Sequence, residues 1–435
     1  MVGVRLLPLP PKEALDYFRS KGLAPIDESF DHRDIWRGQH AVSFVVAKAA
    51  REDVLKLIRD ELTREMEEGW PLARFQAELK PKLVAAGWWG RGMLRDPQGP
   101  APEVEQDVQM GSMHRLRVIF DTNMRTSMAA GRWARLWRNR DAFPYLAYHQ
   151  IDRPTRRLNH KRFDGGVWRI DDPIWERIYP PNGWFCGCSV EPITQGQIDR
   201  GSFTLSPPLD LDEVEWFNER TGQTEMIPFG VHPGFDVNPG LIRQRMDDAF
   251  APTGLDTRHE LALLAADLEE RMRREGIERA IAVQSGQPVH IRYIGESTAV
   301  GIDDRVGPGA DVIHSHPDFP ALSEADIWLL QKRQFRSIFG VTPEGEVFGA
   351  LAEPGGDLIF HGATKRFLRE WGQPGNVWEL TGATEWERMT LQGHALAMWL
   401  EKSGAITYFR PRGRRFDALL AKYAALLDVV SRAHS

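Results

Sequence analysis

Apolar residues recur at intervals of three and four along the first third of the chain, the spacing that places side chains on one face of a helix. One stretch predicts a long helix over residues 42–68, ended by the glycine that follows it. Further helices are predicted around residues 14–21, before Gly87, and from His114 to Arg140. The stripe positions are Val54, Leu55, Ile58, Leu62 and Met66, then Phe75, Leu79 and Leu83, then Leu116, Ile119, Phe120, Met124 and Met128.

The middle of the chain changes character. Residues 96–103 are rich in Pro and Gly and predict a loop, and residues 147–193 contain short strand-like runs separated by turn residues. Residues 251–254, Ala-Pro-Thr-Gly, are typical of a linker. Thr257 and Glu260 then have the spacing of a helix capping box, so we expect a new domain to begin with a helix there.

Strand-like and helix-like runs alternate after this linker. The predicted strands cover 289–294, 311–316, 337–341 and 346–351, and the predicted helices cover 323–336 and 415–432. The last helix carries an apolar stripe that we expect to pack within its own domain, although docking on a neighbouring protein is the alternative. We therefore predict an α+β protein with a mainly helical N-terminal domain over 1–250, helical in 1–140 and strand-and-loop in 141–250, and an α/β domain over 255–435.

Composition narrows the classes of protein. A chain of 435 residues is too long for one core and favours two or three domains. Its 27% of charged residues and net charge of -6 are typical of a soluble globular protein and give no overall attraction to nucleic acid. No apolar run is long enough to cross a membrane, and prolines interrupt the N-terminus too early for a secretory signal. We therefore expect a reducing cytoplasm around the chain.

The two cysteines are the first candidate for chemistry. Cys186 and Cys188 are separated by one glycine and follow the turn sequence Pro180-Pro181-Asn182-Gly183. A disulfide within so short a loop is strained, whereas two thiolates can share one metal ion with ligands from elsewhere. The alternative is a pair of free thiols beside a tight turn.

Two motifs carry a resemblance to a known family. The first is the run from Asp152-Arg153 through His160 and Asp172-Pro173 to Cys186-Gly187-Cys188, and the second is His232-Pro233-Gly234-Phe235-Asp236-Val237-Asn238-Pro239-Gly240. In this order they resemble the phage Mu protein F-like head morphogenesis proteins, over about the first 250 residues. The resemblance implies a minor capsid protein acting in head assembly near the portal. Its implied partners are the portal protein, the major capsid protein and phage DNA, and its implied locations are the virion and, during assembly, the host cytoplasm.

The family motif also bears on metal binding. His160 lies inside the motif and is the best third ligand beside the cysteines, with Asp152 as the fourth candidate and His149 a poorer one. Four filled positions would make this a structural Zn²⁺ site that clamps loops together.

A second candidate lies in the C-terminal half. His314 and His316 project to one face of the predicted strand, because side chains alternate along a strand. Asp326, one turn into the next helix, could complete a three-ligand Zn²⁺ site that leaves a position for water. The His-Ser-His-Pro strand end followed by Ser323-x-x-Asp326 resembles the JAB/MPN metallopeptidases.

That resemblance implies further roles. Ser323 would assist the oxyanion, and an upstream glutamate, Glu278 or Glu296, would act as general base. The alternative for Ser323 and Asp326 is a helix N-cap with a carboxylate three residues later. The rival function for the whole chain is accordingly a zinc metallopeptidase or effector domain carried on a capsid-targeting module.

The arginines of the helix over His114–Arg140 are the third candidate. Arg132 and Arg135 among them could contact packaged DNA. The favoured alternative is a solvated helix face whose arginines pair with nearby carboxylates.

Overall fold

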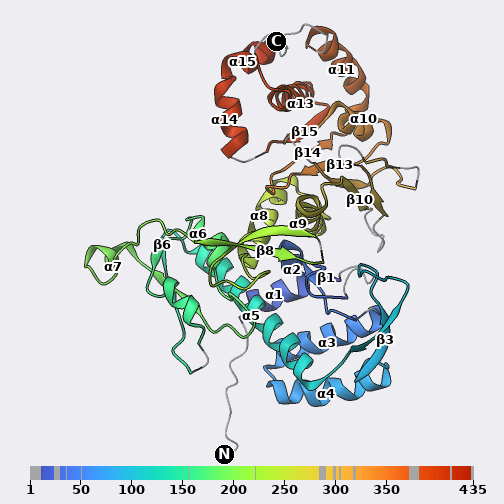
Figure 1. Ribbon diagram of the computed structural model, residues 1–435. Coiled ribbons are helices and arrows are strands. Elements are labelled where there is room, and N and C mark those ends of the chain that lie inside the picture. Colours follow the sequence, from blue (N-terminus) through green and yellow to red (C-terminus); the bar gives the residue numbers. More distant parts are fainter. Residues whose placement is uncertain are drawn as a thin grey trace, which may run out of the picture. The chain divides into compact units, whose positions relative to one another are not determined.

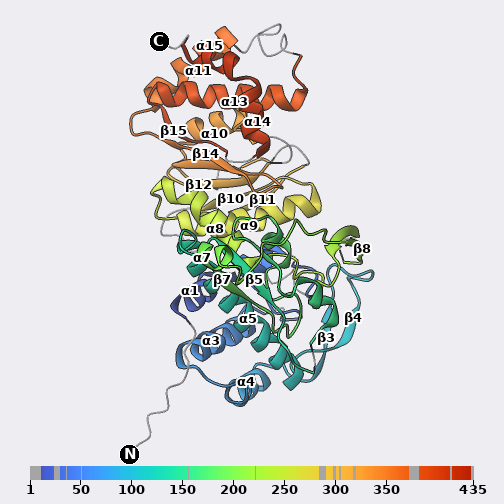
Figure 2. The same ribbon diagram turned by 90° about the vertical axis from the view of Figure 1, so that its left-hand side faces the viewer.

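The chain divides into two compact units, Met1–Arg245 and Met246–Ser435, and each is described by itself. The structure is a computed structural model (Figures 1 and 2). It describes residues 11–23, 30–35, 37–49, 51–154, 156–220, 222–283, 291–296, 300–302, 305–316, 320–371, 382–411 and 414–432. Within these residues, no helix combines the length and the apolar composition needed to cross a membrane.

Helices form the first core of the N-terminal unit. They are α1 (Lys12–Ser20), α2 (Gly38–Val42), α3 (Glu52–Glu68), α4 (Leu72–Ala85) and α5 (Met113–Arg138). The predicted helix over 42–68 is wrong in its first third, where residues 43–44 form strand β2 (Ser43–Phe44). The chain cannot stay helical there because Lys48 has a positive φ of 62° and Arg51 is extended. Gly69 ends α3 in the left-handed conformation, as predicted.

α5 is the long central helix of this unit, and it packs closely on α1. A side chain at Gly131 would meet the backbone nitrogen of Ala14 at 2.6 Å, so the close approach of the two helices requires glycine. The stripe predicted for α5 holds at Leu116 and Ile119, which are buried. It is wrong at Met128, which is 45% exposed, because the buried face continues instead through Trp133.

Strands in the N-terminal unit form small sheets. A three-stranded antiparallel sheet has the order β6-β5-β7, and two hairpins pair β3 with β4 and β8 with β9. The loop predicted at 96–103 therefore joins two strands that the sequence pattern did not indicate. The bounds are β1 (Gly22–Leu23), β3 (Arg91–Arg95), β4 (Glu105–Gln109), β5 (Tyr145–His149), η2 (Leu158–Phe163), β6 (Val167–Arg169), α6 (Ile174–Ile178), β7 (Ser189–Ile193), α7 (Gln195–Asp199), β8 (Glu213–Asn218), β9 (Gln223–Pro228) and α8 (Pro239–Phe250).

The C-terminal unit is built on a mixed sheet. Its six described strands have the order β11-β10-β12-β13-β14-β15, in which β12 and β13 are parallel and the other pairs are antiparallel. Helix α9 covers one face, and α10, α11, α13, α14 and α15 lie over the other (Figures 1 and 2). The bounds are α9 (Arg258–Glu275), β10 (Arg279–Val283), β11 (Ile291–Ile294), β12 (Asp311–Ser315), α10 (Glu324–Lys332), β13 (Ser337–Val341), β14 (Val347–Ala352), α11 (Asp357–Trp371), α13 (Glu385–Lys402), β15 (Ile406–Phe409), α14 (Arg414–Lys422) and α15 (Ala424–Arg432).

Two sequence predictions fail in this unit. Thr257 does precede α9, but its side chain forms no cap hydrogen bond and donates instead to the carboxylate of Asp311. The predicted helix over 415–432 is two helices, because the chain breaks after Lys422. The four predicted strands agree with β11 to β14 to within a few residues, although residues 289–290 lie outside the described part of the chain.

Candidate functional site

The turn at residues 180–183 and the residues up to Cys186 are called the proline corner here. Three arginines donate hydrogen bonds to main-chain carbonyls of this segment. Arg157 donates to the carbonyl of Trp184 at 3.0 Å, and Arg125 of α5 donates to that of Cys186 at 2.9 Å. Arg153 donates to the carbonyl of Phe185 between them. Three consecutive carbonyls thus have charged donors, which form stronger hydrogen bonds than neutral ones. Arg153 belongs to the first family-like motif, but none of the three arginines was predicted to bind these carbonyls.

Asn182 joins the two family-like motifs. Its side chain is fully buried, accepts from the Tyr148 hydroxyl at 2.6 Å, and donates to the carbonyl of Ile178 at 2.9 Å. Its carbonyl accepts from the backbone N–H of His232, the first residue of the second motif, at 3.0 Å. Gly183 follows with a φ of 156°, and a side chain there would collide with the Arg157 guanidinium. Contacts with Tyr148, Arg157 and His232 therefore fix the backbone conformation of the corner.

His160, Cys186 and Cys188 converge behind this corner. His160 Nδ1 lies 3.7 Å from the Cys186 sulfur and 3.4 Å from the Cys188 sulfur. Nitrogen and sulfur ligands at ~2.0 and ~2.3 Å from one tetrahedral Zn²⁺ lie about 3.5 Å apart, so the spacing fits that ion. The prediction that His160 accompanies the two cysteines thus agrees with the geometry, and the donor set suits zinc or another soft divalent ion.

The thiols of this cluster interact strongly. The hydrogen bond with Cys188 lowers the pKa of Cys186, burial opposes this, and the hydrogen bond with His160 lowers it further. The same contact with Cys186, together with burial, raises the pKa of Cys188. One thiol therefore ionises readily and holds its neighbour protonated, and a cation is needed before both can be thiolates.

Asp152 is not brought to this cluster. Its side chain is 92% exposed and pairs with Arg156 at 2.8 Å. His149, the poorer candidate, is half exposed and contacts Glu191 at 2.9 Å. The structure thus assembles three of the four predicted ligands. A small cavity of about 150 Å³ adjoins them, lined by His160, both cysteines and several arginines.

The second cluster lies on the C-terminal sheet. His314 and His316 alternate along the end of β12, and Asp326 approaches them from the first turn of α10. The Nε2 atoms of His314 and His316 lie 3.3 and 3.8 Å from the two carboxylate oxygens of Asp326. Two ligands at ~2.1 Å from a tetrahedral ion lie about 3.4 Å apart, so this trio also fits Zn²⁺. The structure thus brings together the three residues named from the sequence, and their binding of a metal stays a prediction.

Burial and the neighbouring charges shift the pKa of Asp326 in opposite directions. Burial alone would raise the pKa of Asp326, but the charges of His314 and His316 and the hydrogen bonds from His316 and Ser323 lower it. Burial lowers the pKa of His314. Asp326 is therefore an anion beside a largely neutral histidine at neutral pH, which is the protonation state that metal ligands require.

Ser323 and Asp326 also form the helix cap that was the alternative reading. The Ser323 hydroxyl accepts from the backbone of Asp326, and the Asp326 carboxylate accepts from the backbone and hydroxyl of Ser323. The cap and the metal-like trio use the same carboxylate, so the two interpretations are compatible. The cap fixes the carboxylate that faces the histidines.

Glu278, rather than Glu296, lies beside this cluster. Ala280 pairs with His314 in antiparallel register, and two residues further along this register Glu278 falls opposite His316. Glu278 is buried, which raises its pKa to about 7, and the charge of His316 acts on it. Glu296 is the backbone neighbour of Glu278, whose N–H donates to the Glu296 carbonyl at 2.8 Å, but the Glu296 side chain is exposed. Of the two glutamates named from sequence, only Glu278 has the burial and position of a general base.

The arginine-rich helix α5 has mostly internal partners. Arg135 and Arg138 pair with Glu13 at 3.2 and 2.5 Å. Arg125 pairs with Asp121, and Arg132 approaches the carbonyl of Val190 at 3.4 Å. These contacts are typical of the solvated helix face, and a DNA contact through Arg132 and Arg135 stays a prediction.

Comparison with known proteins supports the resemblance for the first unit. Residues 56–191 match the family described as Phage Mu protein F like protein. The chain is 38% identical over 258 residues to the putative capsid assembly protein F of Escherichia phage Mu, covering 55% of this chain and 56% of that protein. It is 35% identical over 167 residues to the Mu-like prophage FluMu F protein of Haemophilus influenzae, covering 38% of each.

The matches cover only part of this chain and of its relatives. The chain spans about half the length, or less, of these relatives. No solved structure matches it. The resemblance of the C-terminal unit to JAB/MPN proteins is supported by none of these matches.

Proposed function

We propose, from the match of residues 56–191 to the Phage Mu protein F family and the 38% identity to the Mu capsid assembly protein, that this protein acts in head assembly of a tailed phage or prophage. That identity over 258 residues is the observation that carries the proposal. It includes more residues than the family match.

The finer role follows from the resemblance. The protein would be a minor capsid component near the portal vertex, binding the portal and major capsid proteins, present in the virion and assembled in the host cytoplasm. Contact with phage DNA through Arg132 and Arg135 belongs to the same proposal. The support for it is the name of the Mu relative and the presence of both family-like motifs in one unit.

The cysteine cluster would serve this role as a clamp. His160, Cys186 and Cys188 would hold a Zn²⁺ ion, which supplies a structural cross-link between η2 and the proline corner. The arginines that bind the carbonyls of Trp184, Phe185 and Cys186 would orient the corner for it. The ion would thus stabilise the loops that the two motifs form.

A complementation experiment tests the proposed function. Deleting the gene from the phage or prophage that encodes it should leave no DNA-filled heads, because the portal vertex would lack this component. The wild-type chain supplied from a plasmid should restore them, and His314→Ala with His316→Ala should restore them equally. Electron microscopy and infectious titre give the readout. Normal heads without the gene would refute the assignment to head assembly.

A second function is favoured by the position of Glu278. We propose as the alternative that residues 255–435 form a JAB-like metallopeptidase domain. His314, His316 and Asp326 would hold a Zn²⁺ ion that supplies an activated water, and Glu278 would accept the proton from that water. A pKa of about 7 suits a group that must both take and return a proton near neutral pH.

Hydrolysis of labelled casein measures this alternative directly. Glu278→Gln should lower the rate by about 10²- to 10⁴-fold, the usual contribution of a general base, while keeping the zinc content. Glu296→Gln is the matched control and should leave the rate unchanged, because that side chain is exposed. A zinc-loaded wild-type protein that cleaves nothing, or equal effects of the two substitutions, would remove the enzyme hypothesis.

A further inference from the structure

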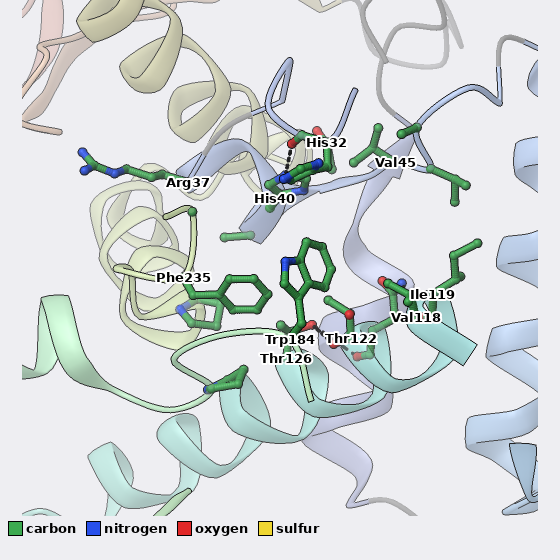
Figure 3. Close-up of a pocket in the computed structure, with 18 of the residues that line it drawn as sticks. His32, Arg37, His40, Val45, Val118, Ile119, Thr122, Thr126, Trp184 and Phe235 are labelled. Atoms are coloured by element: carbon green, nitrogen blue, oxygen red, sulfur yellow. Dashed lines mark hydrogen bonds between the residues drawn. The ribbon is translucent and has the colours of Figure 1, made fainter. Parts of the chain in front are cut away.

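A large cavity lies within the N-terminal unit, apart from the metal clusters. Its volume is about 750 Å³, within the range of sites that hold a ligand of several hundred daltons. It is lined by the segment over 31–48, by one face of α5, and by both family-like motifs (Figure 3). The two motifs that carried the family resemblance therefore meet on one cavity.

The walls of this cavity are largely apolar. Trp184 and Phe235, one from each motif, meet edge to face with ring centroids 5.0 Å apart (Figure 3). On the α5 side, the hydroxyl of Thr126 and the amide of Asn123 are bonded to carbonyls of their own helix. These two donors are thus satisfied within the helix, so the part of α5 around them presents mainly carbon to a ligand, while Arg115 nearer the start of the helix is charged.

Several polar groups in the cavity are cationic or unsatisfied, and the carboxylate that lines it, Asp31, is already paired with His32 and Arg33. Lys21 is 5% exposed, donates to the carbonyl of His40 at 2.7 Å, and has no carboxylate partner among the described residues. Arg115 donates to main-chain carbonyls of 47, 109 and 110 and likewise has no described carboxylate partner. The hydroxyl of Tyr17 is buried without a hydrogen-bond partner in the described chain. A buried hydroxyl left unpaired is costly, so it points to a group that is supplied from outside.

We propose that this cavity binds an apolar peptide segment of a capsid partner, through a carboxylate that pairs with Lys21 and accepts from Tyr17. The inference rests on the proposed function for the class of partner. It rests on the cavity for the chemistry, since apolar side chains fit the Trp184–Phe235 wall and an anion offsets the cations. Arg115 adds a second positive charge to the same cavity.

Binding of a carboxylate is expected to change the protonation state of Lys21. Burial lowers the pKa of Lys21 to about 7, so at pH 8 most of the free protein carries it as a neutral amine. The titratable groups nearest to it are Tyr17 on α1 and His40, whose pKa burial lowers to about 4. His32, Asp31 and Arg115 line the same cavity, and Arg243 of α8 acts on Tyr17. A bound carboxylate would favour the ammonium, so binding takes up a proton and weakens as the pH rises above 7.

Overlapping synthetic peptides covering the portal and major capsid proteins of the same phage serve as the probe. Calorimetry with the full-length chain, in buffers of different ionisation enthalpy, should find at least one apolar peptide carrying a carboxylate that binds with proton uptake at pH 8. Replacing its carboxylate by an amide should weaken binding. Lys21→Met should weaken it about thirtyfold or more and abolish the proton uptake, since a buried charge pair is lost. Tyr17→Phe should weaken it roughly tenfold.

Controls separate this cavity from general effects. Lys80→Met, on the exposed face of α4, should bind the peptide as the wild type does. Thr122→Trp, on the α5 wall, should fill part of the cavity and also block binding, which tests the site if Lys21→Met does not fold. No binding peptide, full binding by Lys21→Met, or binding only of peptides from this chain itself would each overturn the proposal. A wild-type chain that restores heads yet binds no peptide refutes this inference alone, whereas normal heads without the gene refute the proposed function.

Discussion

Replacing Cys186 and Cys188 together by serine is expected to remove zinc from the purified protein and to destabilise the N-terminal unit by at least about 4 kcal/mol. That is the contribution of a ligand present at about a thousand times its Kd. The reason is that His160 Nδ1 lies 3.7 Å from the Cys186 sulfur and 3.4 Å from the Cys188 sulfur, the spacing that the proposed ion requires. For a unit of this size the loss corresponds to a fall in Tm of about 10 °C.

Metal analysis and scanning calorimetry measure the two effects. A chelator should lower the Tm of the wild type to that of the double variant and should leave the variant unchanged, which separates loss of metal from altered packing. His149→Ala is the matched control, because His149 is half exposed and outside the cluster. A wild type that carries no metal, or a double variant as stable as the wild type, would contradict the clamp.

Asp311→Ala is expected to destabilise the C-terminal unit by about 3–5 kcal/mol, as removal of one partner from a buried charge pair does. The Asp311 side chain is fully buried at the start of β12. It accepts from Arg336 Nε at 2.9 Å and from the Ser337 hydroxyl at 2.7 Å, and also from Thr257. Alanine would leave all three donors without this acceptor in a closed site.

The chain provides a close control for this prediction. Asp256 also pairs with Arg336, at 2.8 Å, but its side chain is 66% exposed. Asp256→Ala should therefore cost less than about 1 kcal/mol, the usual value for a surface pair. Urea unfolding, followed by hydrogen exchange in β12 and β13, measures both variants. Equal losses would mean that burial of Asp311 adds nothing to the interaction.

The sequence predicted those features that depend on interactions between residues close together in the chain. The trio on β12 and α10 follows from strand alternation and a capped helix, both of which act within a few residues. The end of α3 at Gly69 follows from the backbone freedom of glycine. Asp152 was predicted at the metal cluster because it opens the same motif, but Arg156 four residues later pairs with it in solvent.

Contacts between residues far apart in the sequence could not be predicted, because they form only when the folded chain brings those residues together. Thr257 has the spacing of a cap, yet a buried carboxylate 54 residues away is a better partner for its hydroxyl. The cavity around Lys21 is lined by segments far apart in the sequence, and the patterns of α5 and of the two family-like motifs do not indicate that these segments meet beside Lys21. A lysine in an otherwise ordinary turn after α1 gives no signal until the walls around it are known.

The 26 residues of α5 have a consequence for how the first unit comes apart. The first half of this helix packs into the core with Leu55 and Leu79, and its second half packs through Trp133 against the strand region around Trp175. A cut near residue 140, where helical and strand regions divide along the sequence, would therefore expose apolar surface on both products. The unit should behave as a single foldon, and a protease that nicks it there should destroy both fragments rather than release a stable one.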